Sequence, residues 1–439
     1  MNNLLVVLFV ALSVSCHAPA GSPDFGAPDR GTDAGAPQEA GPQDAAPPPS
    51  SFGGRRIPGR WFAGDFHVHS TGASNDTGAE STPERIREVA IERGLEFVVL
   101  TDHSNSTGSD TTTRDEDPAL FNLGPEFPYW DKAAMLSDEM FLMVDGNEIS
   151  PVHEPPTEPT CHIGCYPLEL DTFNPNIAFR DRPRSSLTCA EIVPQAREAG
   201  CFVTVNHPFV VTSWMAFDWT TRDYDALEVF NGGAGWDKFD HLAVLGWACD
   251  LALGRDTVAI GGSDNHRIET EPPGILANPP LGRPTTWVWS GALDWKGIIA
   301  GLQDGRVSVG DTGVALELDV YDAAKRWLGL QGDEVASGEV AWLRARGALH
   351  NSEGEARKLQ FVRVRSGACN DTRTEFEITA PEPELEVLAE FDVEPGVAFD
   401  EAVEVELAPG DVAFVWLRPP TADVLGAHGV AVTNAIRAR

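Results

Sequence analysis

Between residues 61 and 311 the chain alternates short apolar runs with amphipathic segments. The apolar runs are rich in β-branched and aromatic residues, and this alternation predicts parallel strands joined by helices. A total of seven such units favours a barrel over an open sheet. The predicted strands are WFAGDFHV (61–68), EFVVLT (96–101), MFLMVDG (140–146), CFVTVN (201–206), ALEVFN (226–231), TVAIGG (257–262) and TTWVWS (285–290).

Two of the amphipathic segments carry helix start and stop signals. In STPERIREVAIERG (81–94), Ser81 and Glu84 have the spacing of a capping box, Pro83 lies in the first turn and Gly94 marks the end. LTCAEIVPQAREAG (187–200) repeats the pattern, with Thr188 and Glu191 at its start and Gly200 at its end.

After about residue 312 the period changes to two, with turn residues between the runs. This pattern predicts a small antiparallel β domain over 312–439. We expect it to pack against the barrel or to shape the substrate site, without a catalytic role. Its runs are VALELDVYD, LQFVRVRSG, TEFEITA, AVEVELAPG and VAFVWLRP.

The N-terminus, MNNLLVVLFVALSVSCHAPAG, has an apolar stretch of about ten residues, which indicates a cleaved export signal. Cys16 after LSVS resembles a bacterial lipobox, so we expect a membrane-anchored lipoprotein, periplasmic or at the cell surface, in preference to a secreted protein. The Ala/Pro/Gly-rich stretch that follows is too polar to fold. The predicted organisation is a signal peptide (1–16), a disordered tether (17–54), an α/β barrel (55–311) and the β domain (312–439).

The formal net charge is −35, from 32 Lys and Arg against 67 Asp and Glu. Nucleic acid and anionic membrane surfaces are disfavoured as partners, because phosphate contacts need cationic side chains. The expected partner is a small molecule, with membrane contact only through a lipid anchor and the oligomeric state left open.

Besides Cys16 the chain has six cysteines, an even number that permits disulfides in an exported protein. Their connectivity is left open by the sequence. Cys161 and Cys165 are close enough in sequence to form a small loop, and Cys201 opens an apolar run in which a buried thiol is expected.

Five of the predicted strands end in histidines or carboxylates. In a barrel of parallel strands these ends converge on one face, and both residue types are ligands of divalent metals. Each signal alone has an alternative reading as a core histidine or a polar turn, whereas their recurrence predicts one polynuclear site. The residues are His67 and His69, then Asp102 and His103, then Glu148, then His207, and finally Asp264 and His266.

The motifs DFHVHS, LTDHS, GNEIS, VNHP and GGSDNH, in this order, resemble the signature of the PHP (polymerase and histidinol phosphatase) superfamily, and most closely its CehA/McbA group. The resemblance covers roughly residues 61–310. It implies a distorted (β/α)7 barrel with two or three divalent ions, Zn, Mn or Fe, at its mouth. The ligands it implies are His67, His69, Asp76, His103, Glu148, His162, His207, Asp264 and His266.

In this resemblance Glu148 bridges two metals, and Asp102 orients a ligand histidine. His162, in CHIGCYP, has the alternative of an idle histidine in a disulfide loop, and Asp76 that of an ordinary loop carboxylate. Arg267 is a candidate for binding substrate at the mouth, or it pairs with Glu269.

The expected function is hydrolysis by a hydroxide that bridges the metals. A phosphoesterase acting on a mono- or diester is the leading hypothesis. The alternative is an amide, ester or carbamate hydrolase on the same site, because a fold does not determine its substrate. A non-catalytic surface-binding lipoprotein is the second alternative, from a different class of protein.

Overall fold

The computed structural model describes residues 52–71, 74, 77–103, 129–150, 162–171, 189–209, 223–233, 235–268, 279–350, 354–370, 381–420 and 426–439. Residues Ser50–Arg439 form one compact unit. The predicted signal peptide, and the predicted tether as far as residue 51, lie outside the described residues. Among the described residues, no helix is both long and apolar enough to span a membrane.

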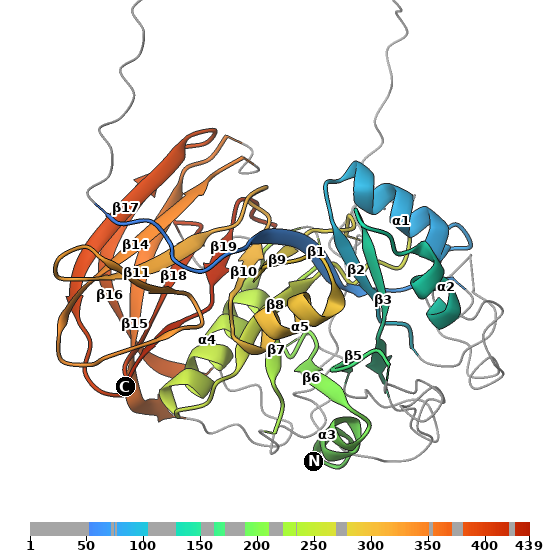
Figure 1. The fold of residues 1–439 in the computed structure, drawn as a ribbon, viewed down its shortest axis with the longest axis horizontal. Helices are drawn as coiled ribbons and strands as arrows, with labels where there is room; N and C mark the ends of the chain where they lie inside the picture. Colours follow the sequence, from blue (N-terminus) through green and yellow to red (C-terminus); the bar gives the residue numbers. More distant parts are fainter. Residues whose placement is uncertain are drawn as a thin grey trace, which may run out of the picture. The chain divides into compact units, whose positions relative to one another are not determined.

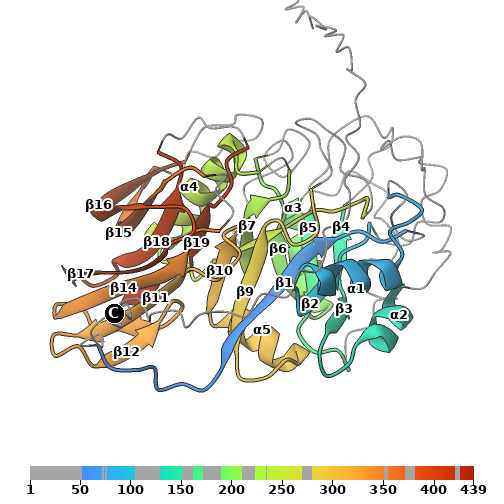
Figure 2. The ribbon, with the colours of Figure 1, turned by 90° about the horizontal axis from the view of Figure 1, so that it is seen from above.

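The largest sheet has eleven strands. They are β1 (Arg60–Val68), β2 (Phe97–Leu100), β3 (Leu142–Asp145), β9 (Thr285–Ser290), β10 (Val307–Gly310), β13 (Glu334–Val335), β15 (Arg357–Asn370), β16 (Glu382–Val393), β18 (Val412–Arg418), β19 (Ala431–Thr433) and β20 (Ile436–Ala438). The path runs β13-β20-β18-β19-β10-β9-β1-β2-β3, and β15 and β16 extend it beside β18. Figure 2 shows β9, β1, β2 and β3 lying side by side.

Two smaller sheets complete the strands. The five-stranded sheet, in sequence order, contains β4 (Asn147–Ile149), β5 (Ile163–Pro167), β6 (Cys201–Val205), β7 (Ala226–Asn231) and β8 (Val258–Gly262). The four-stranded sheet, ordered β12-β11-β14-β17, contains β11 (Glu317–Asp322), β12 (Trp327–Leu330), β14 (Val340–Ala348) and β17 (Ala398–Glu406). All seven strands predicted before residue 311 are therefore confirmed.

The described helices are α1 (Pro83–Glu92), α2 (Tyr129–Leu136), α3 (Cys189–Glu198), α4 (Lys238–Ala252) and α5 (Trp295–Gln303). In α1 the cap is Thr82 instead of the predicted Ser81, because the Thr82 side chain accepts the amide of Arg85. Ser81 is engaged elsewhere, since its hydroxyl accepts the amide of Ile268. Gly94 follows α1 with φ +79°, as its predicted role as a stop requires. Thr188 lies outside the described residues.

The two sheets that carry the predicted barrel strands are connected along the chain and packed together where β8 contacts β1, β9 and β10. The chain passes from β3 to β4 through Gly146, and Val68 forms an isolated parallel bridge with Asn265 beyond β8. Closure of a seven-stranded barrel is not shown by the described residues. The prediction that all seven strands run parallel is wrong for β9, which is antiparallel to β1 and β10. Hydrophobic periodicity reports burial and not strand direction, which explains this difference.

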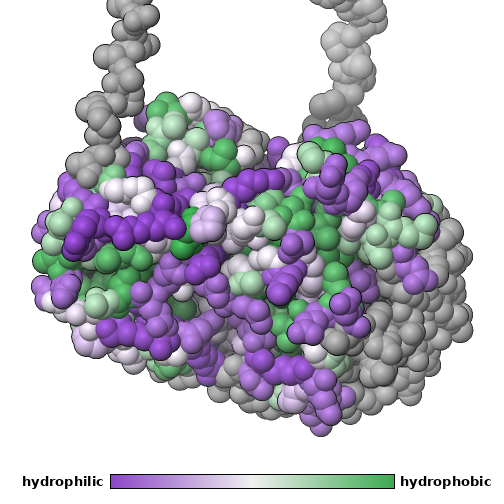
Figure 3. Space-filling model, viewed as in Figure 1, coloured by the Kyte–Doolittle hydropathy of each residue, from purple (hydrophilic) through white to green (hydrophobic). Residues whose placement is uncertain are grey.

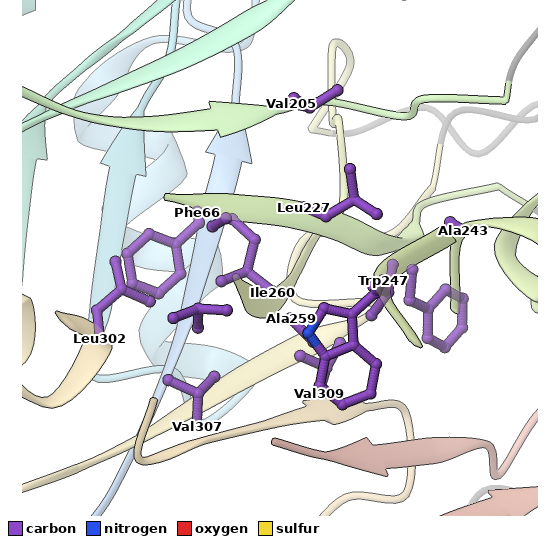
Figure 4. Close-up of a cluster of buried hydrophobic side chains, with 14 of the residues drawn as sticks. Phe66, Val205, Leu227, Ala243, Trp247, Ala259, Ile260, Leu302, Val307 and Val309 are labelled. Atoms are coloured by element: carbon purple, nitrogen blue, oxygen red, sulfur yellow. The ribbon is translucent and has the colours of Figure 1, made fainter. Parts of the chain in front are cut away.

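Apolar side chains from both sheets and from the helices α3, α4 and α5 form the main core. Phe66 on β1, Ile260 on β8 and Val309 on β10 are all fully or almost fully buried and belong to one cluster (Figure 4). Trp247 on α4 lies in the same cluster, and α4 packs against β7 on one side and against β15 and β16 on the other (Figure 1). This core packs β1, β7 and β8 against one another, next to the strand ends that carry the candidate ligands.

The strands after residue 312 pair almost throughout in antiparallel fashion, as predicted. They share the eleven-stranded sheet with the preceding part, because β19 pairs with β10 at Ser308 and Thr433. Phe52, near the end of the predicted tether, contacts the ring of Tyr321 on β11. The predicted run TEFEITA lies outside the described residues, and the domain limits stay predictions.

Two disulfides correct the expectations for cysteine. Cys165 pairs with Cys201, so a Cys161–Cys165 loop and a free Cys201 thiol are both wrong. The second disulfide, Cys249–Cys369, joins α4 to β15. Nothing in the local sequence spacing distinguishes these pairs, because they depend on which strands and helices pack together. Figure 3 shows hydrophilic residues over much of one face of the molecule, in keeping with the high charge.

Candidate metal centre

Eight of the predicted ligands meet in one cluster at the strand ends. Each comes from a different turn or strand end, except for the pairs on β1 and after β8. They are His67, His69, His103, Glu148, His162, His207, Asp264 and His266. The ninth, Asp76, lies outside the described residues.

Glu148, on β4, stands at the centre of this cluster, which we call the histidine cluster. One carboxylate oxygen, Oε1, lies 3.2 Å from Nε2 of His67, 3.1 Å from Nδ1 of His162 and 3.2 Å from Nε2 of His207. The other, Oε2, lies 3.5 Å from Nε2 of His69 and 3.2 Å from Nδ1 of His103. The two oxygens therefore face two different sets of histidines.

Asp264 is the second carboxylate of the histidine cluster. Its Oδ1 lies 3.3 Å from Nε2 of His67, 3.2 Å from Nε2 of His69 and 3.6 Å from Nδ1 of His266. The rings of His69 and His266 stack with centroids 3.9 Å apart. Three histidine nitrogens from two motifs thus converge on a single carboxylate oxygen.

The donor atoms fit divalent cations. Ligand atoms of His67, His69, Glu148 and Asp264 all lie within 4.8 Å of one another, and the same holds for two overlapping trios. Nε2 of His67, Nε2 of His69 and Oε2 of Glu148 are buried without a hydrogen-bond partner of proper geometry. Buried polar atoms without partners are costly, and a bound cation would satisfy these three. The trios are His69 with His103 and His266, and His103 with Glu148 and His162.

The charges in the cluster also favour a cation. Burial opposes ionisation of Glu148, but His162 and His67 hold its pKa well below the usual range. Likewise, burial opposes ionisation of Asp264, and the charge of His67 and the other histidines keeps its pKa well below normal. Burial would lower the pKa of His67, whereas the carboxylates of Asp264, Glu148 and Glu228 raise it well above normal. The site therefore holds two carboxylates that attract positive charge in a buried environment.

Burial and the charges of His266 and His103 lower the pKa of His69 to about 3. Burial also lowers the pKa of His162, more than Glu148 raises it. His69 is therefore neutral near pH 7 and keeps a nitrogen lone pair for a metal.

Asp102 supports the cluster from behind, mainly through serines. Its carboxylate accepts hydrogen bonds from the amide and hydroxyl of Ser70 and from the hydroxyl of Ser74, at 2.6, 2.6 and 2.8 Å. The Ser74 hydroxyl lies 3.0 Å from Nδ1 of His69 and accepts the amide of His103. Burial raises the pKa of Asp102 to about 6. Its contact with the ring of His69 thus runs through Ser74, a residue that the sequence analysis did not single out.

The backbone is strained at two candidate ligands. His207 has φ +26° and Asp264 has φ +55°, both in the region that L residues rarely adopt. Strain of this kind concentrates at functional sites, where the surroundings hold it in place. These backbone conformations direct the side chains of His207 and Asp264 toward Glu148 and the histidines around it.

Two buried carboxylates of the site were missed by sequence reasoning. Asp65, on β1, accepts the amides of His67, Ser263 and Gly282 at 3.1, 3.0 and 2.7 Å. Glu228, on β7, lies beside Nδ1 of His67. The available signal was an acidic residue inside an otherwise apolar strand, which predicts a buried carboxylate with specific partners.

Arg267 follows His266 and is half-buried. Its predicted role at the mouth stays a prediction, and its alternative partner Glu269 lies outside the described residues.

No family model and no curated protein matches the chain. One similar solved structure is a two-domain protein from Bacteroides vulgatus ATCC 8482 described as containing a predicted PHP-like metal-dependent phosphoesterase. It is 14% identical over 87% of this chain and 99% of that one, with a TM-score of 0.38. The lesion-specific endonuclease PfuEndoQ from Pyrococcus furiosus is 16% identical with a TM-score of 0.38, over 56% of each chain.

PsfC from Pseudomonas syringae PB-5123 is 18% identical over 52% of this chain and 82% of that one, with a TM-score of 0.32. Likeness at this level does not bear on function. The function is therefore argued from the side chains of the histidine cluster.

Proposed function

We propose that this protein is a metal-dependent hydrolase of the PHP type, acting as a phosphoesterase on a phosphate mono- or diester. The observation that carries the proposal is the position of Glu148, whose two oxygens face two sets of histidines. A carboxylate in this position is suited to bridge two cations. The five motifs that resemble the PHP signature contribute seven of the eight described members of the cluster, and CHIGCYP contributes His162.

Most members of the cluster have a specific part in this proposal. His67, His69 and Asp264 would hold one cation together with Glu148, and His103 and His162 would hold a second with the same carboxylate. His207 lies beside Oε1 of Glu148, the oxygen that also faces His67 and His162. Divalent ions such as Zn, Mn or Fe supply water activation near neutral pH and neutralise charge on phosphoryl oxygens.

The protein residues exclude bulk water and orient the ligands. His67, His69 and Glu148 are almost completely buried, so electrostatic interactions in the cluster are stronger than at the surface. Asp264 and His162 keep about a fifth to a quarter of their side chains accessible and mark the side from which substrate reaches the cluster.

We also propose that the protein is exported and carries a lipid at Cys16. The disulfides Cys165–Cys201 and Cys249–Cys369 support export, because such bonds persist in oxidising compartments. Mass spectrometry of the mature N-terminus tests this. A lipidated Cys16 is the expected result, and an N-terminus beginning at another residue without lipid would contradict it.

The function is tested by loading the purified protein with Zn²⁺ or Mn²⁺ and measuring turnover of a substrate panel. We expect at least one bound metal per chain and hydrolysis of phosphate esters. If the metal-loaded protein hydrolyses only carbamates, amides or carboxylic esters, the proposed phosphoesterase activity is wrong, and the proposal of a metal-dependent hydrolase stands. Less than one metal per chain after loading would contradict both.

A short oligonucleotide belongs in the same panel, because the exclusion of nucleic acid rests only on charge. Glu148→Gln is expected to abolish whichever activity is found, and Glu386→Gln, on β16 beside Arg365, serves as the matched control. Turnover retained by Glu148→Gln would contradict the bridging role.

A further inference from the structure

Glu228 is a buried carboxylate directly behind two candidate ligands. We propose that it is a positioning residue, which sets the ring orientation and tautomer of His67 and holds the strained backbone of His207. This inference rests on the proposed metal-dependent function and assigns to Glu228 the control of metal affinity at the His67 side of Glu148.

The contacts of Glu228 are divided between its two oxygens. Oε1 lies 3.1 Å from Nδ1 of His67. Oε2 accepts the backbone amide of His207 at 2.7 Å and the side-chain amide of Asn231 at 3.1 Å. With a residue exposure of 2%, the carboxylate exchanges none of these contacts for bulk water.

The contact with His67 decides which ring nitrogen faces the cluster. A carboxylate accepts, so Nδ1 of His67 carries the hydrogen. Nε2, which lies 3.2 Å from Glu148 and 3.3 Å from Asp264, then presents its lone pair to a cation. Partners of this kind behind a ligand histidine orient the ring and raise its basicity.

The contact with His207 acts on the backbone. His207 has φ +26°, and its amide hydrogen bond to Glu228 compensates part of the cost of this conformation. The turn directs Nε2 of His207 to 3.2 Å from Glu148, and its ring stacks on that of His67. One carboxylate therefore fixes two ligands from different strands.

The surrounding strands leave Glu228 little freedom. The pairing of β7 with β8 shifts register between Glu228 and Phe230, and such irregularities re-aim side chains at functional sites. On β8, a Cβ atom at Gly262 would lie 2.9 Å from Oε1 of Glu228 and 2.3 Å from Cβ of His67. The glycine lets β8 pack directly behind this pair.

Glu228→Gln is the decisive variant because it preserves shape. In the wild type, Oε2 accepts two amide hydrogens. In the variant, the glutamine oxygen must therefore occupy the position of Oε2. The glutamine NH₂ group then faces Nδ1 of His67 and donates to it. The hydrogen of His67 is forced onto Nε2, where it blocks the lone pair needed by a cation.

The experiment measures Zn²⁺ affinity of the full chain by competition with a chelator, and the absorption spectrum after loading with Co²⁺. We expect Glu228→Gln to raise the free Zn²⁺ concentration at half occupancy about 10- to 100-fold. The ligand-field bands of bound Co²⁺ are expected to shift or weaken. A purely structural role would leave the Co²⁺ spectrum of the folded protein unchanged.

Asp250→Asn is the matched control. Asp250 is a buried carboxylate on α4 that accepts the hydroxyls of Tyr224 and Thr257 and a hydrogen bond from Arg255. It is expected to lower the melting temperature while the Zn²⁺ affinity stays at the wild-type value. If Glu228→Gln does not fold, Asn231→Ala removes one of the two donors to Oε2 and is expected to weaken Zn²⁺ binding in the same direction.

Two unfavourable outcomes are distinct. Wild-type protein that binds Zn²⁺, together with a folded Glu228→Gln that binds it equally and gives the same Co²⁺ spectrum, would overturn the positioning role alone. Wild-type protein that takes up neither metal would overturn the proposed function, and this assignment with it.

Discussion

Oε1 of Glu148 lies 3.1 Å from Nδ1 of His162, across the antiparallel pair β4–β5. The pairing of Glu148 with Gly164 brings the residue before β5 to the centre of the histidine cluster. His162 is therefore placed beside the predicted bridging carboxylate, and its role as a ligand stays a prediction.

Replacing His162 by alanine is expected to remove one nitrogen donor from the His103 and Glu148 side of the cluster. Since changes behind metal ligands already cost about 10- to 100-fold, the loss of a ligand is expected to lower hydrolytic activity by at least about tenfold. The metal content per chain, measured by elemental analysis, should fall as well. His350→Ala, an exposed histidine outside the cluster, is the control and should match the wild type. Equal metal content and activity in both variants would exclude His162 as a ligand.

Gly262→Ala tests the close approach of β8 to His67. The added Cβ would lie 2.3 Å from Cβ of His67, so one of the two strands must move. Overpacking of this kind costs about 1–3 kcal/mol in the free energy of unfolding. Zn²⁺ affinity should fall with it, because the displaced residue is a candidate ligand. Gly291→Ala has no atom within 4 Å of the added carbon, and chemical denaturation should show a change below about 0.5 kcal/mol for it.

The two disulfides are expected to have different effects on the site. Replacing Cys165 and Cys201 by serine removes a link between β5 and β6, the strands next to His162 and His207. The sequence separation of 36 residues corresponds to a loss of about 4 kcal/mol in the chain-entropy model. We expect this variant to bind Zn²⁺ more weakly as well.

Removing Cys249–Cys369, with a separation of 120 residues, should cost about 5 kcal/mol and leave the Zn²⁺ affinity of the folded protein unchanged. Denaturant titration and chelator competition measure the two quantities. Equal losses of Zn²⁺ affinity in both variants would contradict the proposed local effect of the Cys165–Cys201 link.

Asp240, in the first turn of α4, is expected to make the stability of the fold depend on pH. Burial, followed by the charge of Asp237, raises the pKa of this carboxyl well above its normal value. The folded state therefore holds the proton more tightly than the unfolded chain. Its stabilising contribution is complete below the unfolded pKa of about 3.8 and is lost as the pH rises through the raised folded pKa.

In Asp240→Asn this pH-dependent loss is absent. The variant loses one hydrogen bond at every pH, because Oδ1 and Oδ2 of Asp240 accept the backbone amides of Asn231 and Asp237 and the asparagine has a single oxygen. The free energy of unfolding of the wild type should therefore fall relative to the variant as the pH is raised, by about 1.4 kcal/mol for each unit of pKa shift. Denaturant unfolding at a series of pH values measures this difference. A difference that stays constant with pH would show that Asp240 is not perturbed.

Most of the predicted ligands could be located from the sequence, because a histidine or carboxylate follows a short apolar run at these positions. His67, Glu148 and Asp264 carry this local signal, and the structure places all three together. Ser74 and Glu228 carry no such signal, since their importance lies in the residues they contact across the fold. The cap of α1 moved to Thr82 for the same reason, because Ser81 is held by a residue far along the chain.

The sequence by itself determined where seven of the strands before residue 311 lie and which residues follow them, but it did not predict β4, β5 or β10. Hydrophobic period and turn residues act over a few positions, which is why these seven could be located. The tertiary structure decided that β9 runs antiparallel to β1 and that Cys165 pairs with Cys201. It also decided that Glu228 lies behind His67. These features depend on which segments pack together when the core forms, and contacts between residues far apart in the chain leave no periodic trace in the sequence.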